Sequence, residues 1–174
     1  SMANSDMKSG LSSYENAVRN ALLHGLSNPI NNSSRDHAAI IIREMIKAAK
    51  TSFHAYARAF SNDVWTEETI KELEAAKCRG VDIRLLAESD CDKATLAKMS
   101  PRLRALVRMV RFRDDAGGRP NNFAVADVRA LRYETDSVKR SALFYPMNPK
   151  LARAAEGLFA DLYLTGVPNV ARAA

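Results

Sequence analysis

The sequence predicts an α/β domain in which helices flank a mixed, largely parallel β-sheet. The 174 residues are 47% hydrophobic and 26% charged, which is the composition of one globular domain able to bury its own core. Residues 51–60 alternate as a strand does, a helical segment then ends at Gly80, and an apolar run over 81–87 follows directly. A strand–helix–strand order forces its two strands to lie parallel, and it therefore indicates an α/β sheet.

The chain before this unit is expected to contain a loose arm, a helix and a linker. Residues 1–11 are polar with little to bury, whereas Ser12 and Glu15 form a capping box for a helix that ends near Gly25. Residues 27–34 are turn-forming types throughout, as in a linker. We therefore divide the chain into a polar arm, amphipathic helix and linker over 1–35, an α/β domain over 36–167 and a tail over 168–174.

The first half of the domain follows from periodicity and capping. Apolar residues at helical spacing predict a helix over 36–50, and the strand over 51–60 carries small side chains on one face, which lets a helix approach closely. Thr66 can cap the next helix, and Gly80 is the residue type that ends one. The strand over 81–87 completes the unit.

The second half is expected to contain four more strands and a closing helix. Asn148 followed by Pro149 is a typical helix start, because proline fits the first helical position. The expected elements are short helical turns over 92–99 and 101–106, strands over 107–113, 123–127, 130–134 and 142–145, and a helix that ends by Gly166.

The positive charge is concentrated in one stretch of the chain. The formal net charge is +6, and residues 98–140 hold eleven basic and five acidic residues, whereas the remainder holds fifteen of each. Most of these cations are arginines, whose forked guanidinium suits phosphate and carboxylate groups. Charged stretches commonly do no more than solvate a surface, so the stretch is either a solvated face or an anion-binding face.

Composition also bounds the compartment and the chemistry. Cys78 and Cys91 match no metal-ligand spacing and are interpreted as reduced thiols, which favours a cytoplasmic protein. No apolar run reaches about 18 residues and the polar start has no signal core, so we expect neither membrane insertion nor secretion. No cluster of His, Cys and Asp predicts a metal, and we expect no cofactor.

The order of elements from about Asp36 to Thr165 resembles one half of the phospholipase D-like fold. The segments that carry the likeness are AAKCRGVDIRLLA, MVRFRDDAGGRPNNFAVADVRALRYE and the closing helix MNPKLARAAEGLFADLYLTG. The resemblance implies a phosphodiester as the ancestral substrate. It also implies a homodimer, because family members with a single motif pair two copies so that two half-sites meet.

The chemical part of the family motif is missing. Active members carry His-x-Lys, four residues and then Asp, and aligning on Asp127 puts Pro120 in place of the histidine and Asn122 in place of the lysine. The resemblance implies that the histidine attacks phosphorus and the lysine holds phosphate oxygens, and a proline and an amide supply neither role. The Gly-Ser or Gly-Asn that follows in the family is absent, since residues 132–134 are Arg, Tyr and Glu. We therefore expect a protein without catalytic activity.

Other residues that could carry chemistry have simpler interpretations. Asp127 is expected to bind backbone amides at a strand end, as aspartates in turns do. His54 is interpreted as a structural histidine, because no nucleophile or carboxylate lies at a telling spacing. Residues 33–37 place nucleophile and base types side by side, but neighbours at a helix start do not face one another. Gly117 and Gly118 lack the strand-to-helix context of a phosphate loop.

Our first functional hypothesis is a catalytically silent phospholipase D-like module. It would bind nucleic acid or another phosphate-bearing ligand through an arginine-rich surface. The residues predicted to bind the ligand are Arg58, Arg102, Arg104, Arg108, Arg111, Arg113, Arg119, Asn122 and Asp127.

The second hypothesis belongs to a different class, a protein-interaction or regulatory module. An example would be a small inhibitor, encoded by a bacterium, plasmid or phage, whose partner is an acidic protein surface. The same arginines would then act as anchors beside an apolar patch of Tyr133, Phe144, Tyr145 and Met147. A third and weaker alternative is a residual phosphodiesterase that uses His54.

Overall fold

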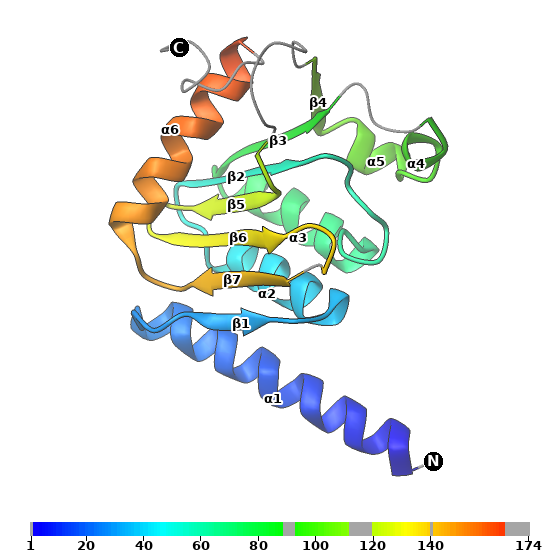
Figure 1. Ribbon diagram of the computed structural model, residues 1–174, viewed down its shortest axis with the longest axis vertical. Helices are drawn as coiled ribbons and strands as arrows, with labels where there is room; N and C mark the ends of the chain where they lie inside the picture. Colours follow the sequence, from blue (N-terminus) through cyan, green and yellow to red (C-terminus); the bar gives the residue numbers. More distant parts are fainter. Residues whose placement is uncertain (1, 89–92, 112–119, 140, 166–174) are drawn as a thin grey trace.

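The computed structural model describes residues 2–88, 93–111, 120–139 and 141–165. Within these ranges seven strands form one sheet, with helices on both of its faces (Figure 1). The elements in chain order are α1 (Met2–His24), β1 (Ile30–Asn32), α2 (Arg35–Ala48), β2 (Ser52–Ala57), α3 (Glu67–Cys78), β3 (Asp82–Glu88), α4 (Lys93–Ala97), α5 (Pro101–Arg104), β4 (Val107–Val110), β5 (Phe123–Ala126), β6 (Ala130–Asp136), β7 (Ser141–Tyr145) and α6 (Pro149–Thr165).

The sheet has the strand order β1-β7-β6-β5-β2-β3-β4. β3 pairs in parallel with β2 and with β4, whereas the other four pairings are antiparallel. The mixed α/β class is confirmed, but the prediction of a largely parallel sheet is wrong. The reason is connection length: β5, β6 and β7 are joined by short turns, which reverse the chain, whereas α3, α4 and α5 join β2, β3 and β4 and let these strands run parallel.

The predicted strand–helix–strand unit is β2, α3 and β3. The Thr66 hydroxyl accepts a hydrogen bond from the Thr69 amide at 3.3 Å, which caps α3 as expected. Gly80 follows the helix with a φ of +89°, a left-handed conformation that glycine adopts at little cost. The chain then turns directly into β3, which lies parallel to β2 from Ser52 to Ala57.

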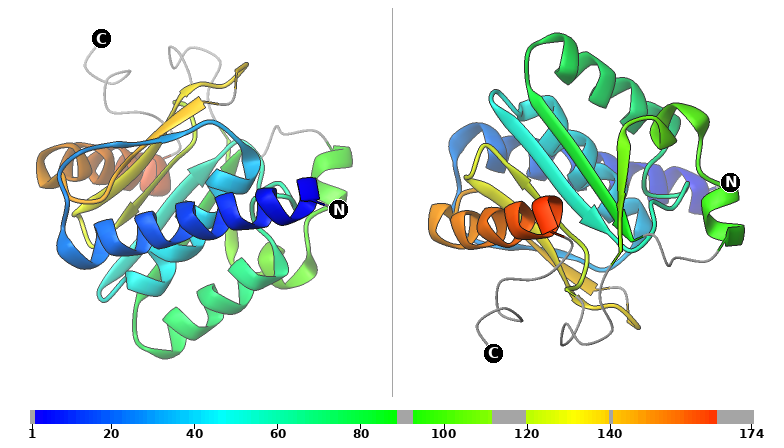
Figure 2. Two further views of the ribbon diagram at one scale, coloured as in Figure 1. Left: turned by 90° about the horizontal axis from the view of Figure 1, so that it is seen from below. Right: turned by 90° about the horizontal axis from the view of Figure 1, so that it is seen from above.

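Alternate residues of the strands build two cores on opposite faces of the sheet. Phe53 of β2 packs in the core under α2 and α3, whereas Tyr56 packs in the core under α6. Both side chains are fully buried, and each contributes roughly 2 kcal/mol through the apolar surface it removes from water. Figure 2 shows the separation of α6 from the other long helices.

The N-terminal arm is helical, which contradicts the prediction of a loose segment over 1–11. α1 runs without a break from Met2 to His24, so Ser12 lies inside the helix and is not its cap. The second half of α1 holds it in place: Val18 is buried, and Arg19 Nη2 lies 2.7 Å from Oε1 of the buried Glu44 on α2. Once this half is anchored, extending the helix costs little, and its first turns project from the rest of the molecule (Figure 1).

The predicted linker over 27–34 contains a strand, which is a second correction. β1 pairs antiparallel with β7, with Ile30 opposite Phe144 and Asn32 opposite Ala142. The sequence did not predict this strand because its side chains are of turn-forming types. The strand forms through backbone hydrogen bonds to an open sheet edge, and these do not depend on side-chain type.

The two ends of the central strands carry different sets of polar side chains. The carboxyl end of β2 and the amino end of β5 lie together, since Tyr56 pairs with Phe123. We call this the cavity end, and it is made by Arg58, Asn122 and Glu134. We call the opposite end the anchor end, and it is made by Ser52, Asp82 and Asp127.

Candidate anion-binding site

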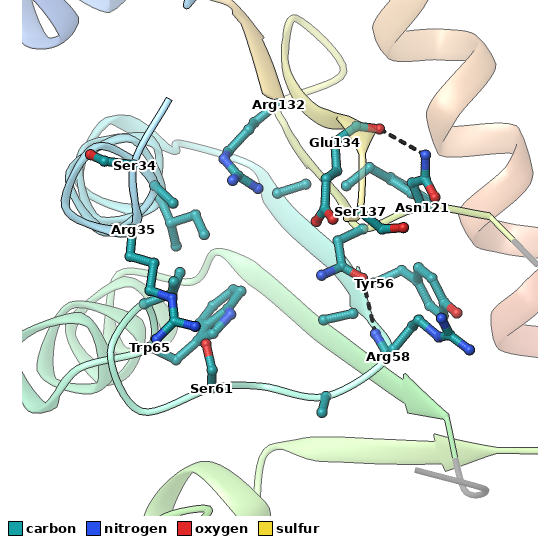
Figure 3. Close-up of a pocket in the computed structure, with 18 residues that line it drawn as sticks. Ser34, Arg35, Tyr56, Arg58, Ser61, Trp65, Asn121, Arg132, Glu134 and Ser137 are labelled. Atoms are coloured by element: carbon teal, nitrogen blue, oxygen red, sulfur yellow. Dashed lines mark hydrogen bonds between the residues drawn. The ribbon is translucent and has the colours of Figure 1, made fainter. Parts of the chain in front are cut away.

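A cavity of about 420 Å³ opens at the cavity end, between the start of α2 and the sheet. It lies on the face that α2 covers, and Figure 3 shows that its polar lining comes from elements far apart in the sequence. The lining side chains with a charge or a hydroxyl or amide group are Ser34, Arg35, Tyr56, Arg58, Ser61, Asn121, Asn122, Arg132, Glu134 and Ser137.

Arg132 on β6 is the most unusual of these side chains. It is 8% exposed, and its Nε donates a 2.8 Å hydrogen bond to Oδ1 of the buried Asn32 on β1. Among the residues that the structure describes, its Nη groups donate no hydrogen bond and no carboxylate lies within ion-pair distance of it. Figure 3 shows the guanidinium pointing into the cavity. A buried cation with no carboxylate in ion-pair contact is costly, so this cavity is suited to receive an anion.

Burial and charge act on Arg132 and Glu134 in opposite ways. Burial lowers the pKa of Arg132, against the opposing charges of Glu134 and Tyr14. Burial also raises the pKa of Glu134 above its ordinary value, although Arg132 and Arg58 favour its charged form. Glu134 therefore shares the cavity with Arg132 and Arg58, and both arginines favour its charged form.

The two other arginines of the cavity are already paired. Arg35, in the first turn of α2, forms an ion pair with Asp63. Arg58 Nε lies 3.6 Å from Oε2 of Glu88 at the end of β3. Their side chains are half exposed, at 52% and 58%, so water screens both pairs. Arg132, in contrast, has no carboxylate within ion-pair distance among the described residues.

The start of α2 completes the cavity. The Ser34 hydroxyl accepts a 3.1 Å hydrogen bond from the His37 amide and caps the helix, and the buried Asn32 donates a 2.9 Å hydrogen bond to the Ser34 carbonyl. Asn32 thus holds both the helix start and Arg132. The amides at this helix end add a partial positive charge on the same side as the guanidinium.

Asn122, which stands where the family motif has lysine, has a structural role at the cavity wall. Its Oδ1 accepts a 3.0 Å hydrogen bond from the Arg58 amide, and its carbonyl accepts a 2.9 Å hydrogen bond from the Glu134 amide. It therefore ties the loop after β2 to β5 and β6. Asn122 and Arg58 are the predicted ligand-binding residues that the structure brings together at this cavity.

Asp127 lies at the anchor end of β5, away from the cavity. One carboxylate oxygen accepts hydrogen bonds from the Thr51 amide at 2.7 Å and the Ser52 amide at 3.0 Å, and the other accepts one from the Lys50 amide at 3.0 Å. Burial works to raise the pKa of Asp127, but these amides outweigh it and hold the pKa below its usual value. The contacts match the amide-binding role expected from sequence and leave Asp127 outside the group that faces the cavity.

The arginines of the basic stretch spread over separate surfaces. Arg102 on α5 pairs with Glu67, at 2.8 Å, and with Glu74, both on α3. Arg108 on β4 lies 4.6 Å from the centre of the Tyr163 ring on α6. Exposed positions are also occupied by Arg104, at the end of α5, and Arg111, after β4. Arg113 and Arg119 lie outside the described residues.

His54 occupies a separate cluster on the α6 face of the sheet. Its ring nitrogens lie 2.5 Å from Glu156 Oε1 on α6 and 2.7 Å from Asp82 Oδ2 on β3, and Phe159 stacks on the ring. Burial works to lower the pKa of His54, but the two carboxylates outweigh it and raise the pKa above its ordinary value. These contacts fasten α6 to the sheet, as a structural histidine does.

The architecture of this chain is the phospholipase D-like fold. A solved structure with this fold and similar to the chain is Nuc from Salmonella typhimurium, a phospholipase D family member, with 20% identity and a TM-score of 0.56 over 79% of this chain and 95% of that one. TrmBL2, an archaeal chromatin protein whose structure shows a mode of DNA binding, has 9% identity and a TM-score of 0.59 over 94% of this chain and 64% of that one.

A third similar structure is phosphatidylserine synthase from Haemophilus influenzae, with 15% identity and a TM-score of 0.57 over 86% of this chain and 42% of that one. No protein-family model and no curated protein sequence matches the chain. The likeness to these structures is one of fold. No described helix is long and apolar enough to span a membrane.

Sequence reasoning missed the residues that define the cavity. Arg132 was counted only as one cation of the basic stretch, and Asn32 was placed in a linker. The signal for Arg132 was an arginine inside the otherwise apolar start of β6, whose neighbours Ala130 and Leu131 are buried. No such signal marked Asn32, because its role depends on the pairing of β1 with β7.

Proposed function

We propose that this chain is a non-catalytic phospholipase D-like module that binds a phosphodiester of nucleic acid in the cavity beside Arg132. The observation that carries the proposal is the buried guanidinium that faces the cavity without a carboxylate partner. A phosphate oxygen fits this guanidinium because two parallel N–H groups can donate to two oxygens.

Three further observations support nucleic acid as the source of the phosphate. The net charge of +6 attracts a polyanion, and the half-exposed Arg35 and Arg58 line the same cavity, where a phosphate can compete with Asp63 and Glu88 for their guanidinium groups. A structure of the same fold, TrmBL2, belongs to a chromatin protein that binds DNA. Exposed arginines such as Arg108 would contact the backbone beyond the cavity.

The absence of catalysis is part of the proposal. Pro120 and Asn122 stand where the family places its nucleophile and its phosphate-binding lysine, and Asn122 is engaged in fixing the cavity wall. Of the three histidines in the chain, His54 is the one considered above for catalysis, and it lies against α6 and pairs with two carboxylates. We therefore expect no turnover of a phosphodiester. The predicted homodimer stays a prediction that light scattering tests.

Binding of labelled oligonucleotides at low salt, measured by fluorescence anisotropy, tests the proposal. Arg132→Met should weaken binding about 100-fold, since it removes a charge-assisted contact in a buried site. Arg132→Lys, which keeps the charge and loses the fork, should weaken binding about tenfold. Wild-type affinity should also fall steeply with salt, as phosphate contacts release counterions.

Three results would contradict the proposal. The first is no binding of DNA or RNA by the wild-type protein at low salt. The second is binding that Arg132→Met leaves unchanged. The third is hydrolysis that co-purifies with the wild-type protein and is lost in a cavity variant, which would make the chain an enzyme. Capture of an acidic protein partner after nuclease treatment would favour the interaction hypothesis instead.

A further inference from the structure

A second cavity, of about 390 Å³, lies on the other face of the sheet at the same end of the strands. Its walls come from β5, β6 and α6 and are mostly apolar or aromatic. The lining residues are Pro120, Asn121, Phe123, Leu131, Tyr133, Glu134, Thr135, Ala155 and Leu158.

The two cavities meet at a common rim. Asn121, Phe123 and Glu134 line both of them, and the Asn121 amide donates a 3.1 Å hydrogen bond to the Glu134 carbonyl across this rim. One cavity presents an unpaired guanidinium and the other presents aromatic and aliphatic side chains. A ligand that spans the rim therefore carries an anionic group next to a flat or apolar group.

We propose that the second cavity holds an unpaired base of the nucleic-acid strand whose phosphate lies beside Arg132, so that the ligand is single-stranded. This inference rests on the proposed function. In a nucleotide, an anion and a flat aromatic ring are joined by one sugar, which matches two cavities joined by one rim. A duplex keeps its bases stacked inside and cannot place one here without flipping it out.

The lining suits a base better than a lipid chain. Tyr133, half-buried and stacked on Tyr145 with ring planes 3° apart, offers an aromatic surface, while the Asn121 amide and the Thr135 hydroxyl lie at the polar margin. A membrane-bound lipid would need an apolar collar around the mouth. Among the described residues, the large apolar side chains that are exposed do not line the second cavity: Met7, Leu23, Leu26, Val138, Leu151 and Leu164.

The test compares three probes of equal phosphate content: a single strand, the same strand with abasic sites throughout, and a duplex of half the length. Wild-type protein should bind the normal single strand about tenfold more tightly than the abasic strand, since stacking of one base on an aromatic side chain gives an effect of this size. It should bind the duplex no better than the abasic strand.

Two variants act on the second cavity without touching Arg132. Tyr133→Ala removes the stacking surface, and Ala155→Leu fills the cavity from α6 with a good helix former. Both should lower affinity for the normal strand to that for the abasic strand and leave abasic binding unchanged. Ala160→Leu, the same substitution at an exposed position of α6, is the matched control and should change nothing.

The outcomes separate the two proposals. Equal binding of all three probes by the wild-type protein, with loss in Arg132→Met, overturns the base cavity and leaves the phosphate site standing. An effect of Ala155→Leu equal to that of Ala160→Leu also overturns it. Binding of phosphatidic-acid vesicles that Ala155→Leu abolishes would assign the cavity to an acyl chain and overturn it. No binding of any nucleic acid overturns both proposals.

Discussion

The two ends of β5 differ in how their charges are satisfied. At the anchor end, Asp127 accepts hydrogen bonds from three consecutive backbone amides, those of Lys50, Thr51 and Ser52. At the cavity end, Arg132 of the neighbouring strand is buried and lacks a carboxylate partner among the described residues. Asp127 therefore serves the fold, whereas the Arg132 guanidinium faces the cavity (Figure 3).

The largest effect on folding is expected at the anchor end. Asp127→Ala should lower the free energy of unfolding by about 2 kcal/mol, because hydrogen bonds to a charged acceptor are strong and three amides lose theirs. Urea denaturation followed by Trp65 fluorescence measures the loss. Asp136→Ala is the matched control, since Asp136 accepts hydrogen bonds from the Val138 and Lys139 amides in an exposed turn. An equal loss in both variants would refute a special role for Asp127.

At the cavity end, removal of the Arg132 charge should affect ligand binding strongly and folding stability little. Arg132→Met should leave the free energy of unfolding within about 1 kcal/mol of the wild-type value, because relief of an unpaired buried charge offsets the orphaned Asn32 oxygen. The same variant loses ligand binding. A loss of stability as large as that of Asp127→Ala would show that Arg132 supports the fold and would remove the contrast between the two ends.

The pH dependence of stability gives a further test of the comparison. Asp127 at the anchor end and His54 under α6 have pKa shifts of opposite direction. The raised pKa of His54 contributes stability that is complete below its unfolded pKa and is lost as pH rises through its folded pKa. The lowered pKa of Asp127 contributes stability that is present above its unfolded pKa and is lost as pH falls through its folded pKa.

Stability should therefore be greatest in mildly acid solution, and His54→Gln should flatten the alkaline side of the profile while leaving the acid side unchanged. Thermal unfolding across about pH 2 to 9, a range that extends below the ordinary pKa of aspartate and above that of histidine, measures this. An alkaline limb that persists in His54→Gln would assign it to another group.

The smallest effect on binding and on stability is expected for Arg102, one of the arginines of the basic stretch. Arg102→Ala should change oligonucleotide affinity less than twofold, because its guanidinium is paired with Glu67 and Glu74, and should change stability by no more than about 0.5 kcal/mol. Anisotropy titration beside Arg132→Met makes the comparison direct. A loss similar to that of Arg132→Met would restore the basic stretch as the binding surface.

Much of the fold could be predicted from the sequence because periodicity and capping act locally. Thr66, Gly80 and Asn148 marked helix ends correctly, and Asn148 Oδ1 accepts a hydrogen bond from the Leu151 amide at 3.1 Å as a cap does. The direction of the strands was not predicted correctly, although the few residues between β5 and β6 favour a reversal. The strand β1 had no local signal, since its sequence Ile-Asn-Asn is paired only through its backbone.

The candidate site was predicted in part. Through Asn122, the family motif pointed to the cavity end of β5, and Arg58 lies beside Asn122. Arg132 could not be singled out, because charge is visible in a sequence and burial is not. His54 lacked a carboxylate nearby in sequence, yet the topology brings Asp82 and Glu156 to its two nitrogens from residues 28 and 102 positions away.

The pairing of β1 with β7 has a consequence for the order of folding. Residues 30–32 can pair only after residues 142–144 have been synthesised. This contact therefore closes one of the longest loops in the domain, and the entropic cost of closing that loop falls late in folding. Asn32, which orients Arg132, is part of that last strand to dock. A nascent chain that lacks β7 also lacks α6, so it would have neither the core under α6 nor a competent cavity, and ligand affinity would report on completion of folding.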